Sequence, residues 1–327
     1  MKSFEYASPA KLEDATRLLS DGWDETGILA GGTDLVTSLK QGIIAPKRVV
    51  SLKAVSGLKG IELAEGQAHI GAMTSLAEIS EHTAMRESYP SLVHAIDSIG
   101  SPQIIAMGTL GGNLCQRPRC WYFRQGFGLL GQLDGKSLIP DGDNRYHAIF
   151  GNQGPAYFVS PSSLAPALVA LGASVDIAGP NDRTRQVKMA EFYRIPQQAH
   201  EREYALEPNE IVTRISIPVS GLANATYKVR QRSGLDWPLL TASVAFESAA
   251  AARRAVVVLG HVAPKPWLAA KASAVLEGKP VDEDLAAKAG EAAAEGATPL
   301  SMNEYKIQLV KTAVKRAILV AAGLMEG

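Results

Sequence analysis

The sequence predicts an α+β fold with a two-part N-terminal region and a smaller C-terminal domain. Residues 1–52 alternate short strands and helices, which is typical of a small α/β unit. From about residue 55 the pattern changes to a hairpin and helices, and after about residue 222 three strands precede three helical segments. These changes divide the chain into domains at 1–55, 56–219 and 220–327.

The first domain contains a glycine-rich turn between a strand and a helix. Ser8 and Pro9 favour a helix start, as N-cap and first helical residue, before an apolar stripe within 12–19. The remaining expected elements are strands over 27–30 and 48–52 and a helix from residue 35.

Gly31 and Gly32 form this turn. Glycine adopts backbone angles that other residues avoid, and it lets another group approach the main chain closely. Thr33 and Asp34 are both candidate N-caps of the following helix. Free N–H groups at a helix start attract anions, so the turn is predicted to hold a phosphate-bearing ligand mainly through its backbone. An ordinary turn is the alternative at this point.

The second domain contains a second glycine-rich turn, at 108–113, and a long segment without periodicity, at 115–160. The two glycine-rich turns either clamp a diphosphate from two sides or are unrelated to each other. A segment as long as 115–160 without periodicity is usually either functional or an insertion. The other expected elements are a hairpin over 61–70, helices over 75–81, 90–99 and 164–171, and strands over 174–177 and 210–218.

The C-terminal domain is expected to hold a three-stranded antiparallel sheet with helices. Its strands are expected over 223–231, 241–247 and 254–259, and its helices over 266–276, 281–295 and 305–325. Strand alternation places Lys228, Arg230 and Arg232 on one face. That face is either solvated or a contact for a phosphate or a partner.

Composition excludes several classes of function. The chain has 33 Lys and Arg against 33 Asp and Glu, so it is not expected to bind nucleic acid. It lacks an apolar run of about 18 residues, so no membrane span is expected. Two cysteines, Cys115 and Cys120, are too few for a disulfide framework, and a cytoplasmic location is the simplest interpretation.

Neither a metal site nor a catalytic residue can be assigned. Cys115 and Cys120 lie among Arg117, Arg119 and Arg124. Only His147 is near them in sequence as a further ligand, whereas a tetrahedral metal site or an iron–sulfur cluster normally needs four ligands. Ordinary thiols are therefore expected. Without a catalytic cluster, the chemistry is expected to belong to a cofactor.

Four motifs in one order carry a family resemblance: 30–35 (AGGTDL), 109–114 (TLGGNL), 228–230 (KVR) and 259–267 (LGHVAPKPW). The chain resembles the FAD-binding (medium) subunits of the xanthine dehydrogenase, or molybdenum hydroxylase, family over essentially its whole length. Relatives include the corresponding subunits of carbon monoxide dehydrogenase, 4-hydroxybenzoyl-CoA reductase and bacterial aldehyde oxidoreductases. The resemblance implies a flavin-binding fold of the vanillyl-alcohol oxidase (PCMH) type, followed by a C-terminal α/β domain.

The resemblance also implies the residues that bind FAD. The first glycine turn would hold the pyrophosphate, the second would lie beside the flavin, and two later positions would supply a backbone contact and a lysine. In that order, these residues are Leu29, Ala30, Gly31, Gly32, Thr33, Asp34 and Leu35; Thr109, Gly112 and Asn113; Val212; and Lys228.

The chain departs from the family at two places. Where the family often has Ser-Asp, with the Asp contacting FAD, this chain has Ser162-Ser163, so Ser163 offers only a hydroxyl. Some relatives carry an insertion that holds a 4Fe–4S cluster; residues 115–160 resemble it, and Cys120 matches its first ligand. Because the other cysteines are missing, we expect the insertion without the cluster.

The resemblance implies an electron-transfer subunit of an oxidoreductase. Substrate would be oxidised at a molybdenum cofactor in a large subunit, and electrons would pass through 2Fe–2S clusters of a small subunit to FAD here. NAD⁺, O₂ or a quinone would then accept them. The expected assembly is a heterotrimer, with its dimerisation left open. A stand-alone FAD-dependent oxidase and a flavin-free assembly subunit are the alternatives.

Overall fold

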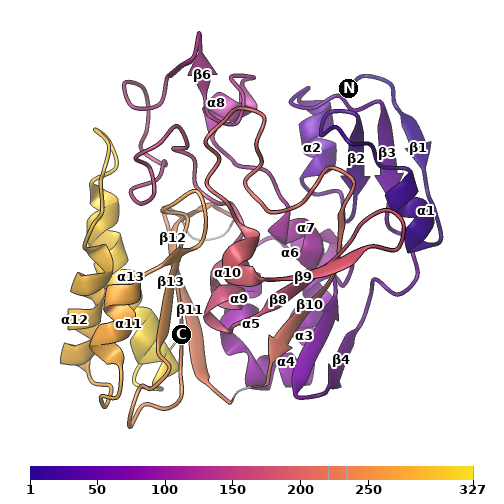
Figure 1. Cartoon of the computed structure of the whole chain (residues 1–327). Coiled ribbons are helices and arrows are strands. Elements are labelled where there is room, and N and C mark those ends of the chain that lie inside the picture. The colour runs from indigo at the N-terminus through magenta and orange to yellow at the C-terminus, as the bar shows by residue number, and fades with distance from the viewer. Residues whose placement is uncertain (220, 233–234, 327) are drawn as a thin grey trace.

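The computed structural model describes residues 1–219, 221–232 and 235–326. Figure 1 shows three parts side by side, each with its own sheet, and a projecting segment that carries β6 and α8. Residues 220 and 327, which begin and end the predicted C-terminal domain, lie outside the described residues. Within the described ranges, none of the helices is long and apolar enough to cross a membrane.

The N-terminal part is a parallel sheet in the order β1-β3-β2, as an α/β unit requires. Its elements are β1 (Glu5–Ala7), α1 (Leu12–Arg17), β2 (Thr26–Leu29), α2 (Leu35–Lys40) and β3 (Arg48–Ser51). The prediction that Ser8 caps the first helix is wrong, because Lys11 is its N-cap. The Ala10 carbonyl accepts a hydrogen bond from the Ser56 N–H, so this segment is held outside the helix.

The middle part is a five-stranded antiparallel sheet in the order β4-β5-β10-β8-β9. Its strands are β4 (Ile61–Ala64), β5 (Gln67–Gly71), β8 (Ser174–Ala178), β9 (Thr184–Lys188) and β10 (Ile211–Pro218). The associated helices are α3 (Leu76–Glu81), α4 (Thr83–Ser88), α5 (Pro90–Asp97), α6 (Pro102–Met107), α9 (Ala165–Ala170) and α10 (Met189–Phe192). Ile70, Ile215 and Leu92 are fully buried in the core between sheet and helices. This core fixes β10 at the centre of the sheet.

The second glycine-rich turn is not a turn. Gly111 and Gly112 lie inside a short helix, α7 (Leu110–Leu114), and the Thr109 hydroxyl accepts a hydrogen bond from the Gly112 N–H as its cap. Gly111 packs against Ala72: a Cβ added at Gly111 would lie only 2.9 Å from the Ala72 Cβ. Glycine therefore allows close packing at this position. A helix as short as Leu110–Leu114 shows too few turns to be recognised from sequence periodicity.

Residues 115–160 form a folded segment with its own small core. It contains α8 (Trp121–Arg124) and a hairpin of β6 (Gln132–Leu133) and β7 (Lys136–Ser137). Phe123, Leu130 and Phe158 are buried together. The aromatic residues of this segment thus hold it against the rest of the chain.

The C-terminal part is an antiparallel sheet with helices packed along it (Figure 1). Its elements are β11 (Ala223–Arg230), β12 (Pro238–Phe246), β13 (Val256–Gly260), β14 (Trp267–Leu268), α11 (Ala270–Leu276), α12 (Glu283–Ala294) and α13 (Tyr305–Ala321). The three predicted strands are confirmed, and β14 adds a short fourth. The helix predicted from residue 266 begins at Ala270, because Trp267 and Leu268 pair with β13 instead.

Candidate functional site

A cavity of about 220 Å³ lies where the turn between β2 and α2 meets α7 and β10. Its lining includes both apolar side chains, such as Ile28, Pro46 and Leu206, and charged groups. The sequence-predicted residues that line this cavity are Ala30, Gly31, Gly32, Thr33, Asp34, Leu35, Thr109, Gly112 and Val212. Segments that are far apart in the chain thus come together at one site.

Glycine at position 31 is required by the close approach of two parts of the protein. A Cβ at Gly31 would collide with the backbone carbonyl of Met107, at the end of α6. Gly32 has a φ of +86°, in the region that glycine tolerates best. The turn is therefore shaped by contact with α6 as well as by its position at the cavity.

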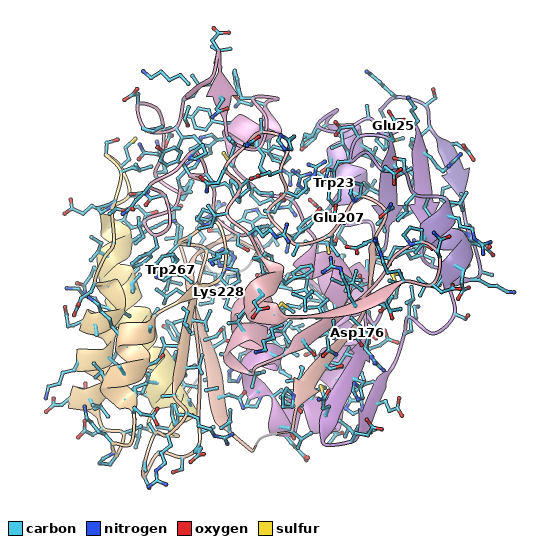
Figure 2. The ribbon with its side chains drawn as sticks, viewed as in Figure 1. Trp23, Glu25, Asp176, Glu207, Lys228 and Trp267 are labelled. Carbon is cyan, nitrogen blue, oxygen red and sulfur yellow. The ribbon has the colours of Figure 1, made fainter. Side chains whose placement is uncertain are left out.

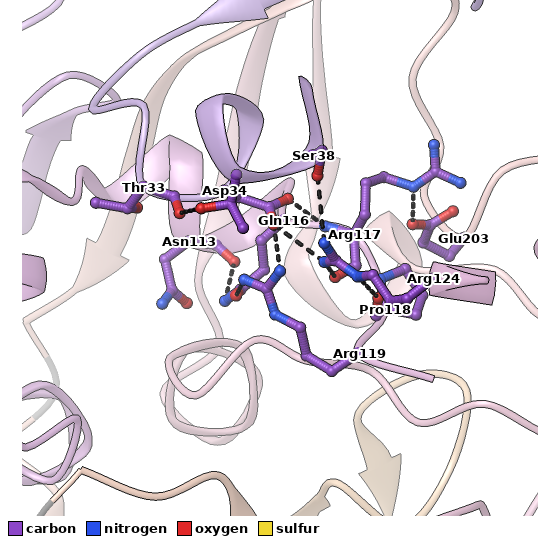
Figure 3. A network of polar contacts seen from close by, with 11 residues as sticks. Thr33, Asp34, Ser38, Asn113, Gln116, Arg117, Pro118, Arg119, Arg124 and Glu203 are labelled. Atoms are coloured by element: carbon purple, nitrogen blue, oxygen red, sulfur yellow. Dashed lines mark hydrogen bonds and ion pairs between the residues drawn. The ribbon is translucent and has the colours of Figure 1, made fainter. Parts of the chain in front are cut away.

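Asp34 connects this turn to the segment at 115–124. It occupies the N-cap position of α2, but its carboxylate does not cap the helix. It accepts hydrogen bonds from the Arg117 N–H at 2.9 Å, from Arg124 Nη2 at 3.1 Å and from Arg119 Nη1 (Figure 3). Burial alone would raise the pKa of Asp34, but these arginine charges and the N–H bond hold the pKa below its usual value.

Two arginines that the sequence did not assign to the site line the same cavity. Arg117 Nε donates to the buried Glu203 carboxylate at 2.7 Å, and Arg202 lies over the ring of Trp23 at 4.8 Å. The arginines within 117–124 indicate in the sequence a concentration of positive charge, but the sequence does not indicate which side chains pair with them. Arg202 carried no such signal, because only the fold brings the loop after α10 to the cavity.

Four predicted residues do not line the cavity: Leu29, Asn113, Ser163 and Lys228. Leu29 ends β2, and Ser163 is buried next to Ser162, whose hydroxyl donates to Asn113 Oδ1 at 2.8 Å. Asn113 and Ser163 therefore lie near each other, at the α7 side of the site.

Lys228 lies on β11, away from the N-terminal part where Trp23 is found (Figure 2). Its Nζ donates to the carbonyls of Ser98 at 2.6 Å and Asp236 at 3.2 Å. Burial lowers the pKa of Lys228 to about 8, and the charge of Arg230 adds to this effect. Lys228 thus joins β11 to the end of α5 and does not face open solvent.

Cys120 and His147 form a close pair, with 3.2 Å between Sγ and Nε2. Burial raises the pKa of the Cys120 thiol, and burial together with the Lys306 charge lowers the pKa of His147 to about 4. Both groups are therefore neutral near pH 7, unlike a reactive thiolate–imidazolium pair. Within the described ranges, no group of three His, Cys, Asp or Glu side chains could hold a metal ion.

This buried histidine predicts sensitivity to acid. An unfolded chain takes up a proton on His147 near pH 6.5, whereas the folded chain does so only near pH 4. The contribution of His147 to stability is therefore fully present above pH 6.5, and its loss should lower the free energy of unfolding by about 1.4 kcal/mol per pH unit down to pH 4. Urea unfolding of His147→Gln should show a smaller fall, and the exposed His200→Gln should match the parent. Equal pH slopes for the parent and His147→Gln would contradict this assignment.

Comparison with known proteins gives two family matches. The model described as "FAD binding domain in molybdopterin dehydrogenase" matches residues 2–220. The model described as "CO dehydrogenase flavoprotein C-terminal domain" matches residues 225–321. Together they account for nearly all of the chain.

Individual known proteins are similar to this chain over most of their own length. The FAD-binding subunit of aldehyde oxidoreductase from Escherichia coli is 30% identical over 86% of this chain and 87% of its own. The medium chain of carbon monoxide dehydrogenase from Afipia carboxidovorans is 28% identical over 97% of this chain and 96% of its own length. A chain of quinoline 2-oxidoreductase from Pseudomonas putida 86 superposes with a TM-score of 0.76 at 25% identity, over 99% of this chain and 100% of that one.

Proposed function

The chain belongs to the family of FAD-binding subunits of the molybdenum hydroxylases, and from this premise we propose that it transfers electrons from a partner subunit to an external acceptor. Bound FAD supplies the chemistry, since a flavin accepts and releases electrons. The protein supplies the binding site and the orientation of the cofactor within the complex.

The residues of the cavity fit part of a dinucleotide. At about 220 Å³ the cavity is smaller than the ~300–1,000 Å³ typical of whole ligand pockets, so it suits the adenosine diphosphate half. Its apolar side chains suit an aromatic base, and the turn and Thr109 offer polar groups to a diphosphate. The residues proposed to hold FAD here are Ala30, Gly31, Gly32, Thr33, Asp34, Leu35, Thr109, Gly112 and Val212.

Leu29, Asn113, Ser163 and Lys228 stay in the proposed site as residues outside this cavity. Asn113 and Ser163 would face the remaining, flavin-bearing part of the cofactor from α7 and the start of α9. Lys228 would keep β11 attached to α5 beside them, through its bond to the Ser98 carbonyl. The proposed domain division stays at 1–55, 56–219 and 220–327.

The proposed partners are a large subunit with the molybdenum cofactor and a small subunit with 2Fe–2S clusters. The support is similarity to a medium chain of carbon monoxide dehydrogenase, over almost the full length of both chains. Electrons would enter from the small subunit and leave to NAD⁺, O₂ or a quinone. Substrate oxidation itself would take place in the large subunit.

One observation carries this proposal: the glycine turn, α7 and β10 line one cavity within the match to an FAD-binding domain. The test is to purify the full chain, release its small molecules with acid and identify them by chromatography. FAD near one per chain is expected. A colourless protein that takes up no added FAD would contradict the proposal and favour a flavin-free assembly subunit. Co-purification with iron–sulfur and molybdenum subunits would separate an electron-transfer subunit from a stand-alone oxidase.

A further inference from the structure

We propose that Arg117 and Arg202 bind the diphosphate of the dinucleotide through the surplus positive charge of an arginine cluster, in addition to the glycine turn. This cluster, the arginine wall, consists of Arg117, Arg119, Arg124 and Arg202, of which Arg119 and Arg124 hold the Asp34 carboxylate. Three of its members come from the segment at 115–160, so this segment forms part of the cofactor site. The inference rests on the proposed function, because it assumes that a dinucleotide occupies the cavity.

The first argument is charge balance. The arginine wall has four positive charges, and two carboxylates pair with it, the half-buried Asp34 and the buried Glu203. Asp24 lies 3.7 Å from Arg202, but its side chain is 99% exposed, so water screens its charge. Glu210 also lines the cavity, but it is paired with Arg185 at 2.6 Å. Two positive charges are left over, which matches the two negative charges of a dinucleotide diphosphate.

The second argument is that donors of the wall lack partners. In the part of the chain that the structure describes, Arg117 Nη2, Arg119 Nε and Arg202 Nε are buried without a hydrogen-bond partner. Leaving a buried charged donor unpaired is costly, so such groups usually face a ligand or water. Arg117 and Arg202 both line the cavity, with side chains only 13% and 16% exposed. A phosphate oxygen there would satisfy them.

The third argument is preorganisation. The Arg117 guanidinium lies 5.0 Å from the centre of the Phe123 ring, and Arg202 is stacked on Trp23. Stacking fixes a guanidinium by its face and leaves its edge N–H groups free for an anion. The positive charge of Arg117 also lowers the pKa of Arg202, second to burial, so the two cations repel each other. An anion between them would remove this repulsion.

The test compares FAD and ADP binding to the flavin-free full chain by isothermal titration calorimetry, at low and high salt. Arg202→Gln is the main variant, because Arg202 has no buried carboxylate that would be left unpaired. The double variant R117Q/E203Q removes a buried ion pair as a unit. Arg254→Gln is the control, since Arg254 pairs with Glu247 on the C-terminal part and is 63% exposed.

Arg202→Gln is expected to weaken both FAD and ADP by roughly ten- to hundredfold and to reduce the salt dependence of binding, whereas Arg254→Gln matches the parent. If Arg202→Gln keeps the parental affinity and salt dependence, the arginine wall is wrong while the proposed function stands. If the parent chain binds neither FAD nor ADP, the proposed function itself fails. Should the double variant not fold, Arg202→Gln alone decides.

Discussion

Replacing Gly31 with alanine is expected to remove most of the bound flavin and to destabilise the fold. The added Cβ would collide with the Met107 carbonyl, which is backbone at the end of α6 and cannot rotate away. Either the turn, which lines the cavity, or α6, which precedes the cavity-lining Thr109, must shift. Overpacking of this kind costs about 1–3 kcal/mol. Because the turn lines the proposed cofactor site, most of the flavin should be lost even under conditions where the variant remains folded.

The matched control is Gly22→Ala in the same N-terminal part. A Cβ there would meet only the flexible Glu25 side chain, at 3.5 Å, so flavin content and unfolding temperature should stay close to the parent. Flavin content is read from the absorbance of purified protein, and stability from thermal unfolding. Full flavin content in Gly31→Ala would show that the turn does not shape the site.

The elements of the fold could be predicted largely from local patterns. Alternating apolar residues identified β10, and an apolar run identified β13, because both strands are buried in sheet cores. Boundaries failed where tertiary contacts override local preference. Trp267 looked like part of a helix start, but pairing with β13 makes it a strand residue. Such pairing depends on residues that are distant in sequence.

From the sequence, only the glycine motifs and, through the family resemblance, Val212 could be assigned to the lining of the cavity. Gly31 and Thr109 lie in recognisable motifs, and both line the cavity. Asp34 looked like a helix cap, and its bonds to the arginines could not be foreseen, since they join residues more than 80 positions apart. Arg202 comes from a loop without a motif. Charge pairing across the fold, rather than local pattern, decides this half of the site.

Replacing Lys306 with methionine is expected to give the largest loss of stability among the variants considered. Lys306 lies in α13 and is only 1% exposed. Its Nζ donates to the carbonyls of Tyr146, His147 and His261, each at 3.0 Å. This one side chain therefore ties the last helix to the segment at 115–160 and to the loop after β13.

The expected cost follows from the carbonyls that lose their donor. The His147 carbonyl keeps Asn303 Nδ2 as a donor, but those of Tyr146 and His261 lose the lysine. The buried His261 carbonyl left unpaired costs about 1–3 kcal/mol and the partly buried Tyr146 carbonyl adds a smaller amount, so the free energy of unfolding should fall by roughly 2–4 kcal/mol. Lys315→Met is the control on the same helix, because Lys315 makes only a surface pair with Glu283.

A pH series separates loss of this lysine from a general packing defect. Burial lowers the pKa of Lys306 from its ordinary 10.5 to about 7. Between these values the unfolded chain holds a proton that the folded chain lacks, so stability should rise from pH 7 towards pH 10.5 and lose that gain as pH falls. Lys306→Met should lack the rise between pH 7 and 8 and keep a smaller rise above pH 8, where Lys228 also titrates in the folded chain, whereas Lys315→Met should retain the full parental rise. A parental rise between pH 7 and 8 in Lys306→Met would mean that a group other than Lys306 titrates there, and that Lys306 acts only by filling space.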